Sequence, residues 1–418
     1  MLLDAEVYDD ANFKRMLCDA VESLAVGTAD ELANRMGPLI HQPAGALEEA
    51  LKTLEPGESW AVMPRQVGDN PNLWTPGVKY GVRPGSVTHR TEFFGPVLGV
   101  MRYERLSEAI EIVNATGYGL TSAIHSLDDR EIDQWKAGIH AGNLYINRGT
   151  TGAIVLRQPF GGMGLSSVGP GIKAGGPNYV ACFMDFAAAE TISASSAPMA
   201  GRVGRERGNA EPADDLEFAA LAELLSDDAA KKACFQQAVA SFDAAWRDEF
   251  SREHDHFRLL GQDNLRRYLP FREIVVRVVR TDSMFETLAR LAAARVTGAR
   301  VVASFASDVD SSLLARIDRA TEAWAGGIEL LEETDAELIA HLDHAATVRV
   351  RYAARDRVPL DVRRAAAERG AWIADVPVVG EGLLELLWYL QEQSISHDYH
   401  RYGNLGVRAE EERRPLVK

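Results

Sequence analysis

Residues 273–306 read EIVVRVVRTDSMFETLARLAAARVTGARVVASFA, and this stretch decides the fold class of the C-terminal half. The apolar runs 273–279 and 300–306 are strand candidates, and residues 283–296 between them have the spacing of an amphipathic helix. The same alternation continues toward the C-terminus. We expect further strands at 327–332, 347–353 and 371–378, and helices at 215–225, 228–250, 311–325, 335–343, 360–369 and 383–393. Strands separated by helices predict a doubly wound, mostly parallel, Rossmann-like α/β sheet.

A sheet of this kind is able to bind a nucleotide, but its sequence lacks the phosphate-binding fingerprints. No GxGxxG follows a strand within 273–378, and no GxxxxGK[ST] occurs in the chain. We therefore expect a packing or binding domain in preference to a working nucleotide site.

The N-terminal half also alternates between helical and strand patterns. Helices are expected at 9–24 (capped by Asp9 or Asp10), 43–54, 106–116 (capped by Ser107) and 131–139, and strands at 97–103, 121–126 and 142–147. This pattern predicts a second α/β sheet with covered faces. Small, polar and charged residues at 193–215 indicate a linker, although a long surface loop fits the same composition. The expected domains are 1–192 and 216–418, joined by 193–215.

Composition excludes several classes of partner. The 418 residues carry a formal charge of −16, which disfavours nucleic acid and anionic membrane surfaces. No apolar run is long enough for a membrane span, and the N-terminus lacks the pattern of a signal peptide. The three cysteines, Cys18, Cys182 and Cys234, show neither a disulfide framework nor metal-ligand spacing. A small-molecule substrate and a cytoplasmic location are the expectations that remain.

The first chemically informative stretch is TEFFGPVLGV at 91–100. Gly95-Pro96 forces a turn, so Glu92 and Phe94 are expected to project from a loop at a strand edge. A carboxylate there can accept hydrogen bonds from ribose hydroxyls, and an aromatic ring can pack on nicotinamide. A surface glutamate beside a core phenylalanine is the plainer interpretation of the same residues.

The second informative stretch, residues 147–179, contains nine glycines in 33 residues. Glycine at this density indicates tight turns and backbone N–H groups that are free to meet a ligand. Residues 150–153, which include Gly152 and Ala153, can form an N–H nest for a carboxylate, and Phe160 follows close by in the chain. A merely flexible loop is the alternative, which the apolar residues of 154–165 disfavour.

These residues resemble the C-terminal part of an aldehyde dehydrogenase. More narrowly, they resemble the L-glutamate γ-semialdehyde (pyrroline-5-carboxylate) dehydrogenase module of long-form bifunctional proline-utilisation enzymes. The resemblance is carried by EFFGP at 92–96, NATGYGLT at 114–121, AGNLYINR at 141–148, TTGAIV at 150–155, QPFGGMG at 158–164 and, near the C-terminus, SISHDYHRYGNLG at 394–406. It implies a partial aldehyde dehydrogenase catalytic domain followed by a lid-like α/β domain without catalysis of its own.

The resemblance also implies roles for individual residues. Glu92 matches the ribose-binding glutamate and Phe94 the aromatic that supports the nicotinamide of NAD. Gly152 and Ala153 match the backbone anchor for the substrate's α-carboxylate, and Phe160 matches the aromatic wall beside its aliphatic part. FAD belongs only to the proline dehydrogenase half of such enzymes, and a homo-oligomer is implied for the complete protein.

The sequence departs from the family at the reacting group. An aldehyde dehydrogenase needs a cysteine thiolate and a general-base glutamate, and no GQxC stretch occurs here. The resemblance places both residues upstream of Met1, so we expect no catalytic residue in this chain and no activity from it alone. A fragment, one product of a split gene that needs an upstream complementary chain, a decayed remnant, and a non-catalytic binding or oligomerisation module all remain open.

Two histidine groups have plain interpretations. His254 and His256 resemble a metal pair, but we expect them to point apart on a solvated helix, so no metal site is predicted. His397 and His400, with Asp398, Tyr399 and Arg401, are expected to form a buried polar network with a structural lid role.

Overall fold

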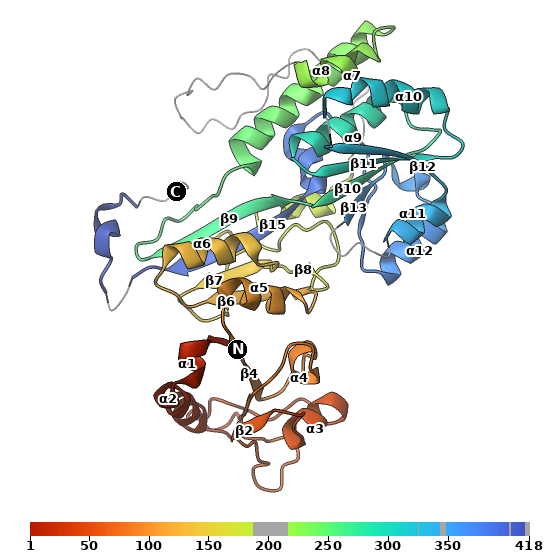
Figure 1. Cartoon of the computed structure of the whole chain (residues 1–418). Helices are drawn as coiled ribbons and strands as arrows, with labels where there is room; N and C mark the ends of the chain where they lie inside the picture. Colours follow the sequence, from red (N-terminus) through yellow and green to blue (C-terminus); the bar gives the residue numbers. More distant parts are fainter. Residues whose placement is uncertain (187–215, 325, 343–347, 401–402, 414–418) are drawn as a thin grey trace. The chain divides into compact units, whose positions relative to one another are not determined.

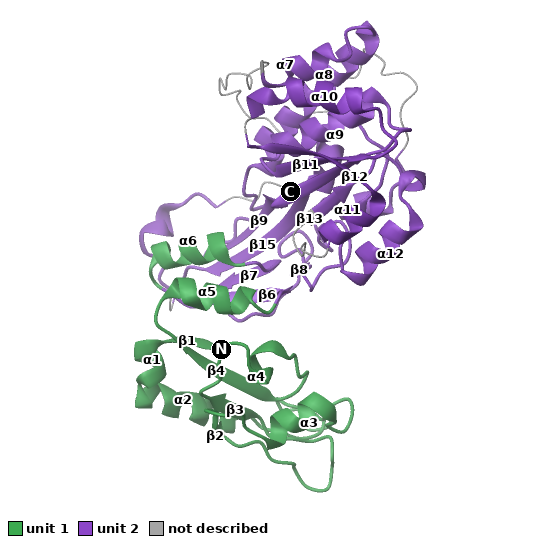
Figure 2. Cartoon of the chain, turned by 45° about the vertical axis from the view of Figure 1, so that its right-hand side comes forward, with its two compact units in different colours: residues 1–116, 127–139 green, residues 117–126, 140–418 purple. Residues whose placement is uncertain are grey.

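The computed structural model describes residues 1–186, 216–324, 326–342, 348–400 and 403–413 (Figure 1). It divides into two compact units, each described by itself below (Figure 2). Unit 1 comprises residues 1–116 and 127–139, and unit 2 comprises residues 117–126 and 140–418. The expected linker at 193–215 lies outside the described residues, so a domain boundary there stays a prediction.

Unit 1 is built on a four-stranded sheet with the order β1-β4-β3-β2. Strands β1 and β3 run parallel to the central β4, whereas β2 is antiparallel to β3. The strands are β1 (Leu2–Asp4), β2 (Ser59–Val62), β3 (Gly77–Tyr80) and β4 (Val97–Tyr103). The helices are α1 (Ala5–Asp9), α2 (Ala11–Glu22), α3 (Gly45–Lys52), α4 (Val87–Arg90), α5 (Leu106–Asn114) and α6 (Asp129–Gly138).

Local chemistry explains where these helices begin. Asp10 caps α2, because its side chain accepts a hydrogen bond from the amide of Asn12 at 2.8 Å. The expected cap at Ser107 is wrong, because α5 already begins at Leu106 with Arg105 in the capping position. Ser107 therefore lies inside the first turn.

Unit 2 contains the predicted doubly wound sheet. Its five strands have the order β12-β11-β10-β13-β14, and every pairing is parallel, which confirms the fold class. The strands are β10 (Glu273–Val278), β11 (Arg300–Ala306), β12 (Ile328–Glu333), β13 (Val348–Arg351) and β14 (Ile373–Ala374). The helices are α7 (Leu216–Glu223), α8 (Ala229–Ala245), α9 (Met284–Val296), α10 (Ser311–Ala320), α11 (Asp335–Leu342) and α12 (Leu360–Glu368).

Both faces of this sheet are covered, as Figure 1 shows. Ile274 and Val276 of β10 belong to the core that includes residues of α8, α9 and α10. Val275, between them, belongs to the core shared with α11 and α12. Because successive strand residues point to opposite faces, this alternation explains why the three consecutive residues 274–276 of β10 are all apolar.

A third sheet joins segments that are far apart in the chain. Its order is β6-β7-β15-β9, with β6 and β15 parallel to β7 and β9 antiparallel to β15. Its strands are β6 (Thr121–Ile124), β7 (Asn143–Ile146), β9 (Gln262–Pro270) and β15 (Leu390–Asp398). The helix expected at 383–393 is wrong: α13 (Gly382–Glu385) and a 3-10 turn (Leu386–Tyr389) lead directly into β15.

Cys182 lies in a short 3-10 helix (Tyr179–Phe183). The expected placement of His254 on a helix is wrong. The helical segment after α8 ends with a π-turn (Trp246–Phe250), so His254 does not lie on a helix; it pairs with Arg266 beside β9. A two-stranded ribbon of β5 (Tyr118–Gly119) and β8 (Met163–Gly164) completes the strands.

Candidate functional site

The predicted cofactor residues lie in unit 1, on the loop between α4 and β4. The loop is fixed at both ends, because the amide of Thr91 donates to the Val87 carbonyl at 3.0 Å and the amide of Gly77 donates to the Pro96 carbonyl at 2.8 Å. Glu92 is exposed and accepts no hydrogen bond from any described residue. Its carboxylate is therefore available to hydroxyl donors of a ligand.

Phe94 combines an exposed side chain with an unusual backbone conformation. Its side chain is 83% exposed, and its φ of 47° lies in the left-handed region, which is unusual for a bulky residue. Such strain persists only where the surroundings impose it, and it is concentrated at ligand-binding sites. An exposed aromatic ring and a free carboxylate two residues apart fit the ring and hydroxyls of a dinucleotide.

His89 holds the short helix that precedes this loop. Its Nδ1 accepts a hydrogen bond from the Gly85 amide at 2.9 Å, which assigns the ring proton to Nε2, and Nε2 lies 2.9 Å from the Ile112 carbonyl. The ring thus ties α4 to the end of α5. It supports the position of the loop that carries Glu92.

The predicted carboxylate-binding residues lie in unit 2, directly after β7. Among the described residues, none accepts a hydrogen bond from the backbone amides of 149–153, which include Gly152 and Ala153. From Ile154 onward the loop is ordered by its own bonds: Ile154 and Gln158 exchange amide–carbonyl bonds at 3.1 and 2.6 Å. A run of free amides ahead of a closed turn is the arrangement that an anion requires.

Gly152 is required for this arrangement on two counts. Its φ of +147° is rarely adopted by residues with a side chain, and a Cβ there would lie 2.5 Å from Gln158 Oε1. Its carbonyl also accepts a hydrogen bond from the Tyr145 hydroxyl at 2.9 Å. The nest expected from the sequence therefore depends on a glycine at this position.

Phe160 is partly buried and is held by Ala174. The two residues exchange amide–carbonyl hydrogen bonds at 3.0 and 3.1 Å. Lys173, next to Ala174, is almost fully buried, and its Nζ donates to the Gly161 carbonyl and to Asn143 Oδ1. The backbone on both sides of Phe160 is thus fixed from within unit 2.

The apolar residues of this loop differ from expectation. Met163 is buried, but Ile154, Val155 and Leu165 are 45%, 70% and 56% exposed. Their hydrophobicity therefore does not hold the loop together within this chain. Polar contacts with β9 and β15 do so instead.

The buried amine of Lys173 should make the free energy of unfolding depend on pH. Burial lowers its pKa to about 7 from the ordinary 10.5, and this effect outweighs the opposing attraction of the Glu392 carboxylate. Above pH 7 the unfolded chain holds a proton that the folded chain lacks, so the free energy of unfolding should rise by up to about 1.4 kcal/mol per pH unit between roughly pH 7 and 9. Urea unfolding across this range should show the rise in wild type and a smaller slope in Lys173→Met. Lys52→Met, at an exposed helix position, should keep the wild-type slope; an unchanged slope in Lys173→Met would contradict the assignment.

None of the cysteines has the environment of a nucleophile. Cys18 packs against the small core of unit 1 and its Sγ lies 3.8 Å from the Ala61 carbonyl. Burial raises the pKa of Cys18, Cys182 and Cys234, whereas a reactive thiolate needs a lowered pKa. The expectation that this chain holds no catalytic residue stays a prediction.

In the doubly wound sheet, the fully buried Arg290 contacts the ends of the neighbouring strands β10 and β13. Arg290 of α9 donates to the carbonyls of Arg277 and Arg351, at the ends of β10 and β13, at 2.6 and 3.1 Å. Ser283 and Glu286 form a capping box at the start of α9, so the helix terminus that would receive a phosphate is already satisfied and carries negative charge. These contacts support a packing role for the sheet.

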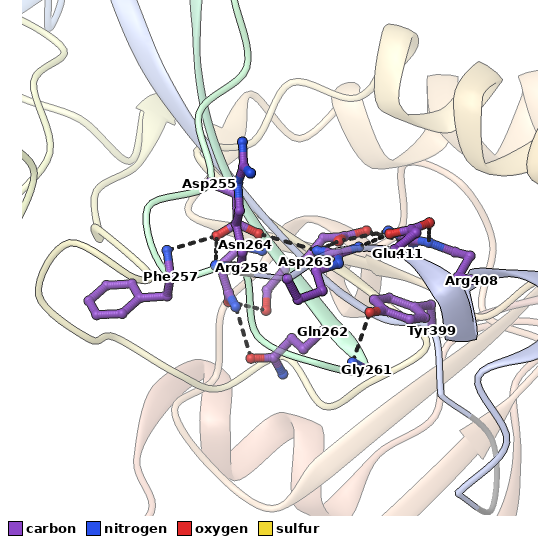
Figure 3. A network of polar contacts seen from close by, with 12 residues as sticks. Asp255, Phe257, Arg258, Gly261, Gln262, Asp263, Asn264, Tyr399, Arg408 and Glu411 are labelled. Carbon is purple, nitrogen blue, oxygen red and sulfur yellow. Dashed lines mark hydrogen bonds and ion pairs between the residues drawn. The ribbon is translucent and has the colours of Figure 1, made fainter. Parts of the chain in front are cut away.

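The second histidine group, which was expected to be buried, is less buried than expected. His397, Asp398 and Tyr399 are partly buried and His400 is exposed, while Arg401 lies outside the described residues. Tyr399 accepts a hydrogen bond from the Gly261 amide at 2.9 Å, and His400 Nδ1 lies 2.9 Å from the Gly261 carbonyl. Figure 3 shows the hydrogen bond between Tyr399 and Gly261. The polar network therefore exists, but near the surface.

The described residues contain neither a cluster of metal ligands nor a helix that could span a membrane. No group of three or more potential metal ligands gathers in the ranges that the structure covers. No helix in those ranges has the length and apolar character needed to cross a bilayer.

Comparison with known proteins identifies the N-terminal part of the chain. Residues 1–188 match the aldehyde dehydrogenase family. Over these residues the chain is similar to part of an aldehyde dehydrogenase domain. This stretch holds all five residues predicted to bind cofactor or substrate: Glu92 and Phe94 in unit 1, and Gly152, Ala153 and Phe160 in unit 2.

Among relatives of this aldehyde dehydrogenase domain, bifunctional protein PutA of Salmonella typhimurium is 40% identical over 176 residues, covering 40% of this chain and 13% of that protein. The 1-pyrroline-5-carboxylate dehydrogenase of Geobacillus thermodenitrificans is 37% identical over 191 residues, covering 45% of this chain and 35% of that protein. The chain thus spans between an eighth and about a third of these relatives.

A solved structure matches beyond the aldehyde dehydrogenase domain. Proline utilization A (PutA) from Corynebacterium freiburgense aligns with a TM-score of 0.70 and 36% identity, covering 94% of this chain and 35% of that chain. The C-terminal doubly wound sheet therefore has a counterpart in a PutA protein.

Proposed function

We propose that this chain supplies the C-terminal part of an NAD-dependent L-glutamate γ-semialdehyde dehydrogenase, which oxidises the semialdehyde to L-glutamate in proline catabolism. The observation that carries the proposal is the run of free amides at 149–153, closed by the Ile154–Gln158 turn and followed by Phe160. The names of the relatives, PutA and 1-pyrroline-5-carboxylate dehydrogenase, support the same substrate.

Each proposed residue has a role that its environment allows. The amides of Gly152 and Ala153 donate to the α-carboxylate, which fixes the amino-acid end of the substrate. Phe160 lines the aliphatic chain and excludes water from it. Glu92 accepts from the ribose hydroxyls, and Phe94 packs on the nicotinamide; when bound, NAD accepts the hydride that leaves the aldehyde carbon.

The reacting groups are proposed to come from other polypeptide. An upstream segment, or a complementary chain, would supply the thiolate and the general-base glutamate. FAD would belong to a proline dehydrogenase part outside this chain. We also propose that the completed protein is a homo-oligomer, and that residues 216–418 form a lid-like domain joined through 193–215.

The test is reconstitution of the complete enzyme. The chain is co-expressed with the polypeptide encoded immediately upstream, and NADH formation is followed with L-glutamate γ-semialdehyde and NAD. We expect NADH to form with the complete pair and not with the 418-residue chain alone. A completed protein that leaves the semialdehyde unoxidised would refute the substrate. A stable oligomer of the 418 residues that gains no activity on completion would favour a binding or assembly module.

A further inference from the structure

One hydroxyl group in unit 2 contacts both ends of the loop that carries the free amides. Arg148, at the start of the loop, donates from Nη1 to Ser396 Oγ at 2.6 Å. Gln158, at its end, donates from Nε2 to the same oxygen at 3.0 Å. Ser396 lies on β15, more than 200 residues along the chain from both.

The bonding capacity of this hydroxyl is fully used. A serine hydroxyl has one proton to donate and two lone pairs to accept with. Ser396 Oγ accepts from Arg148 and Gln158 and donates to Asn264 Oδ1 at 3.0 Å. Because Ser396, Gln158 and Asn264 are 2%, 5% and 3% exposed, water does not compete for these bonds.

A neighbouring residue of β15 adds a parallel contact. Ser394, which points to the same face as Ser396, donates from its hydroxyl to the Pro159 carbonyl at 2.6 Å. Pro159 lies between Gln158 and Phe160, so this bond fixes the backbone next to the aromatic residue. Two alternate serines of one strand thus hold the closing end of the loop.

The contact extends into β9 through Asn264. Its Nδ2 donates to Gln262 Oε1 at 3.0 Å, and its amide donates to Asp255 Oδ2 at 3.2 Å, as Figure 3 shows. Asn264 Oδ1 also accepts directly from Gln158 Nε2 at 3.0 Å. The Ser396 hydroxyl therefore rests on a fixed partner and is not free to rotate.

We propose that Ser396 is a positioning residue for the proposed carboxylate-binding loop: its hydroxyl clamps Arg148 and Gln158 together and so sets the direction of the amides of 149–153. The expected effect of Ser396 on substrate binding rests on the proposed function. Its effect on the order of the loop does not, because the hydrogen bonds of the clamp lie within this chain. Holding donors in place before binding removes the cost of ordering them when substrate arrives.

The proposal is tested first without catalysis. In the full 418-residue chain, Ser396→Ala removes the shared acceptor and Ser396→Thr keeps a hydroxyl. Hydrogen–deuterium exchange is followed at the hydrogen-bonded amides of 154–160, which belong to Ile154, Leu156, Arg157, Gln158 and Phe160. It is expected to become about tenfold faster in Ser396→Ala, the equivalent of losing one buried hydrogen bond. Exchange should stay near wild type in Ser396→Thr, and the amides of α9 should be unchanged in both.

A second variant covers the case in which Ser396→Ala does not fold. Arg148→Met removes one arm of the clamp at a side chain that is 18% exposed, so the core is left intact. It should accelerate exchange at 154–160 by a smaller factor. Wild-type exchange in Ser396→Ala, or in Arg148→Met where only that variant folds, overturns the clamp.

The effect on substrate separates the two proposals. In the completed enzyme, Ser396→Ala should raise KM for the semialdehyde about tenfold and leave KM for NAD unchanged, with Ser396→Thr restoring the wild-type value. If wild type does not oxidise the semialdehyde, the proposed function fails while the exchange experiment still decides the clamp. If KM for NAD rises equally, Ser396 stabilises the protein in general and does not position the loop.

Discussion

Replacing Glu385 by alanine should lower the free energy of unfolding by about 3–5 kcal/mol, because it leaves a fully buried arginine without its counter-charge. Glu385 and Arg351 are both 0% exposed, and their side chains are joined by bonds of 2.9, 3.0 and 3.1 Å. The carboxylate also accepts from the Tyr389 hydroxyl at 2.8 Å and from the Val379 amide at 3.1 Å. Burial raises the pKa of Tyr389 well above its usual value, which keeps this hydroxyl a donor.

Two further variants isolate the cause. Glu368→Ala, at an exposed position of α12, should change the free energy of unfolding by less than about 0.5 kcal/mol. The double variant Arg351→Met with Glu385→Leu removes both charges and should recover most of the loss. Chemical denaturation followed by circular dichroism measures all three. If Glu385→Ala lowers the free energy of unfolding no more than Glu368→Ala does, the Arg351 charge must become hydrated in the variant, and the prediction is wrong.

The parallel sheet was predictable because its strands are buried on both faces. The strand expected at 300–306 matches β11 residue for residue, and the one at 273–279 matches β10 to within one residue. Each strand has a run of consecutive apolar residues, 274–276 in β10 and 301–303 in β11, since neither face meets water there. Hydrophobic pattern alone was therefore sufficient to place them.

Strands β9 and β15 escaped prediction because most of their buried residues are polar. Glu392, Gln393, Ser394 and Ser396 of β15 are all buried, yet their sequence has no apolar alternation. Burial is stabilised there by hydrogen bonds with partners more than 100 residues away, such as Ala141 and Pro159. A local pattern carries no signal of such partners, so residues 383–393 are predicted as a helix although β15 begins at Leu390.

The sequence predicted only part of the candidate site, because some of its residues leave a local pattern and others do not. Glycine density predicted the loop at 150–164, because glycines concentrate where the backbone makes tight turns. The clamp residues Arg148, Ser396 and Asn264 were missed, since their partners come from distant segments. Only the pairing of β15 with β7 brings Ser396 beside the residues that follow β7.

Replacing Gly152 by alanine is expected to abolish the proposed carboxylate site and leave cofactor binding intact. An alanine at φ +147° is strained whatever the space, and its Cβ would meet Gln158 Oε1, whose position is fixed by the clamp. The loop must then rotate the amides of Gly152 and Ala153 away from their common direction. Loss of hydrogen bonds to a charged group, worth about 1.5–3 kcal/mol, predicts a fall in kcat/KM for the semialdehyde of roughly 10- to 100-fold.

Gly149 provides the matched control for this experiment, because it belongs to the same loop but has open space around it and no positive φ. In the completed enzyme, Gly149→Ala should retain kcat/KM within about threefold, a change of under 1 kcal/mol. KM for NAD should be unchanged in both variants, since Glu92 and Phe94 lie on a different loop. Equal losses in Gly149→Ala and Gly152→Ala would mean that general loop flexibility, and not the direction of particular amides, determines binding of the carboxylate.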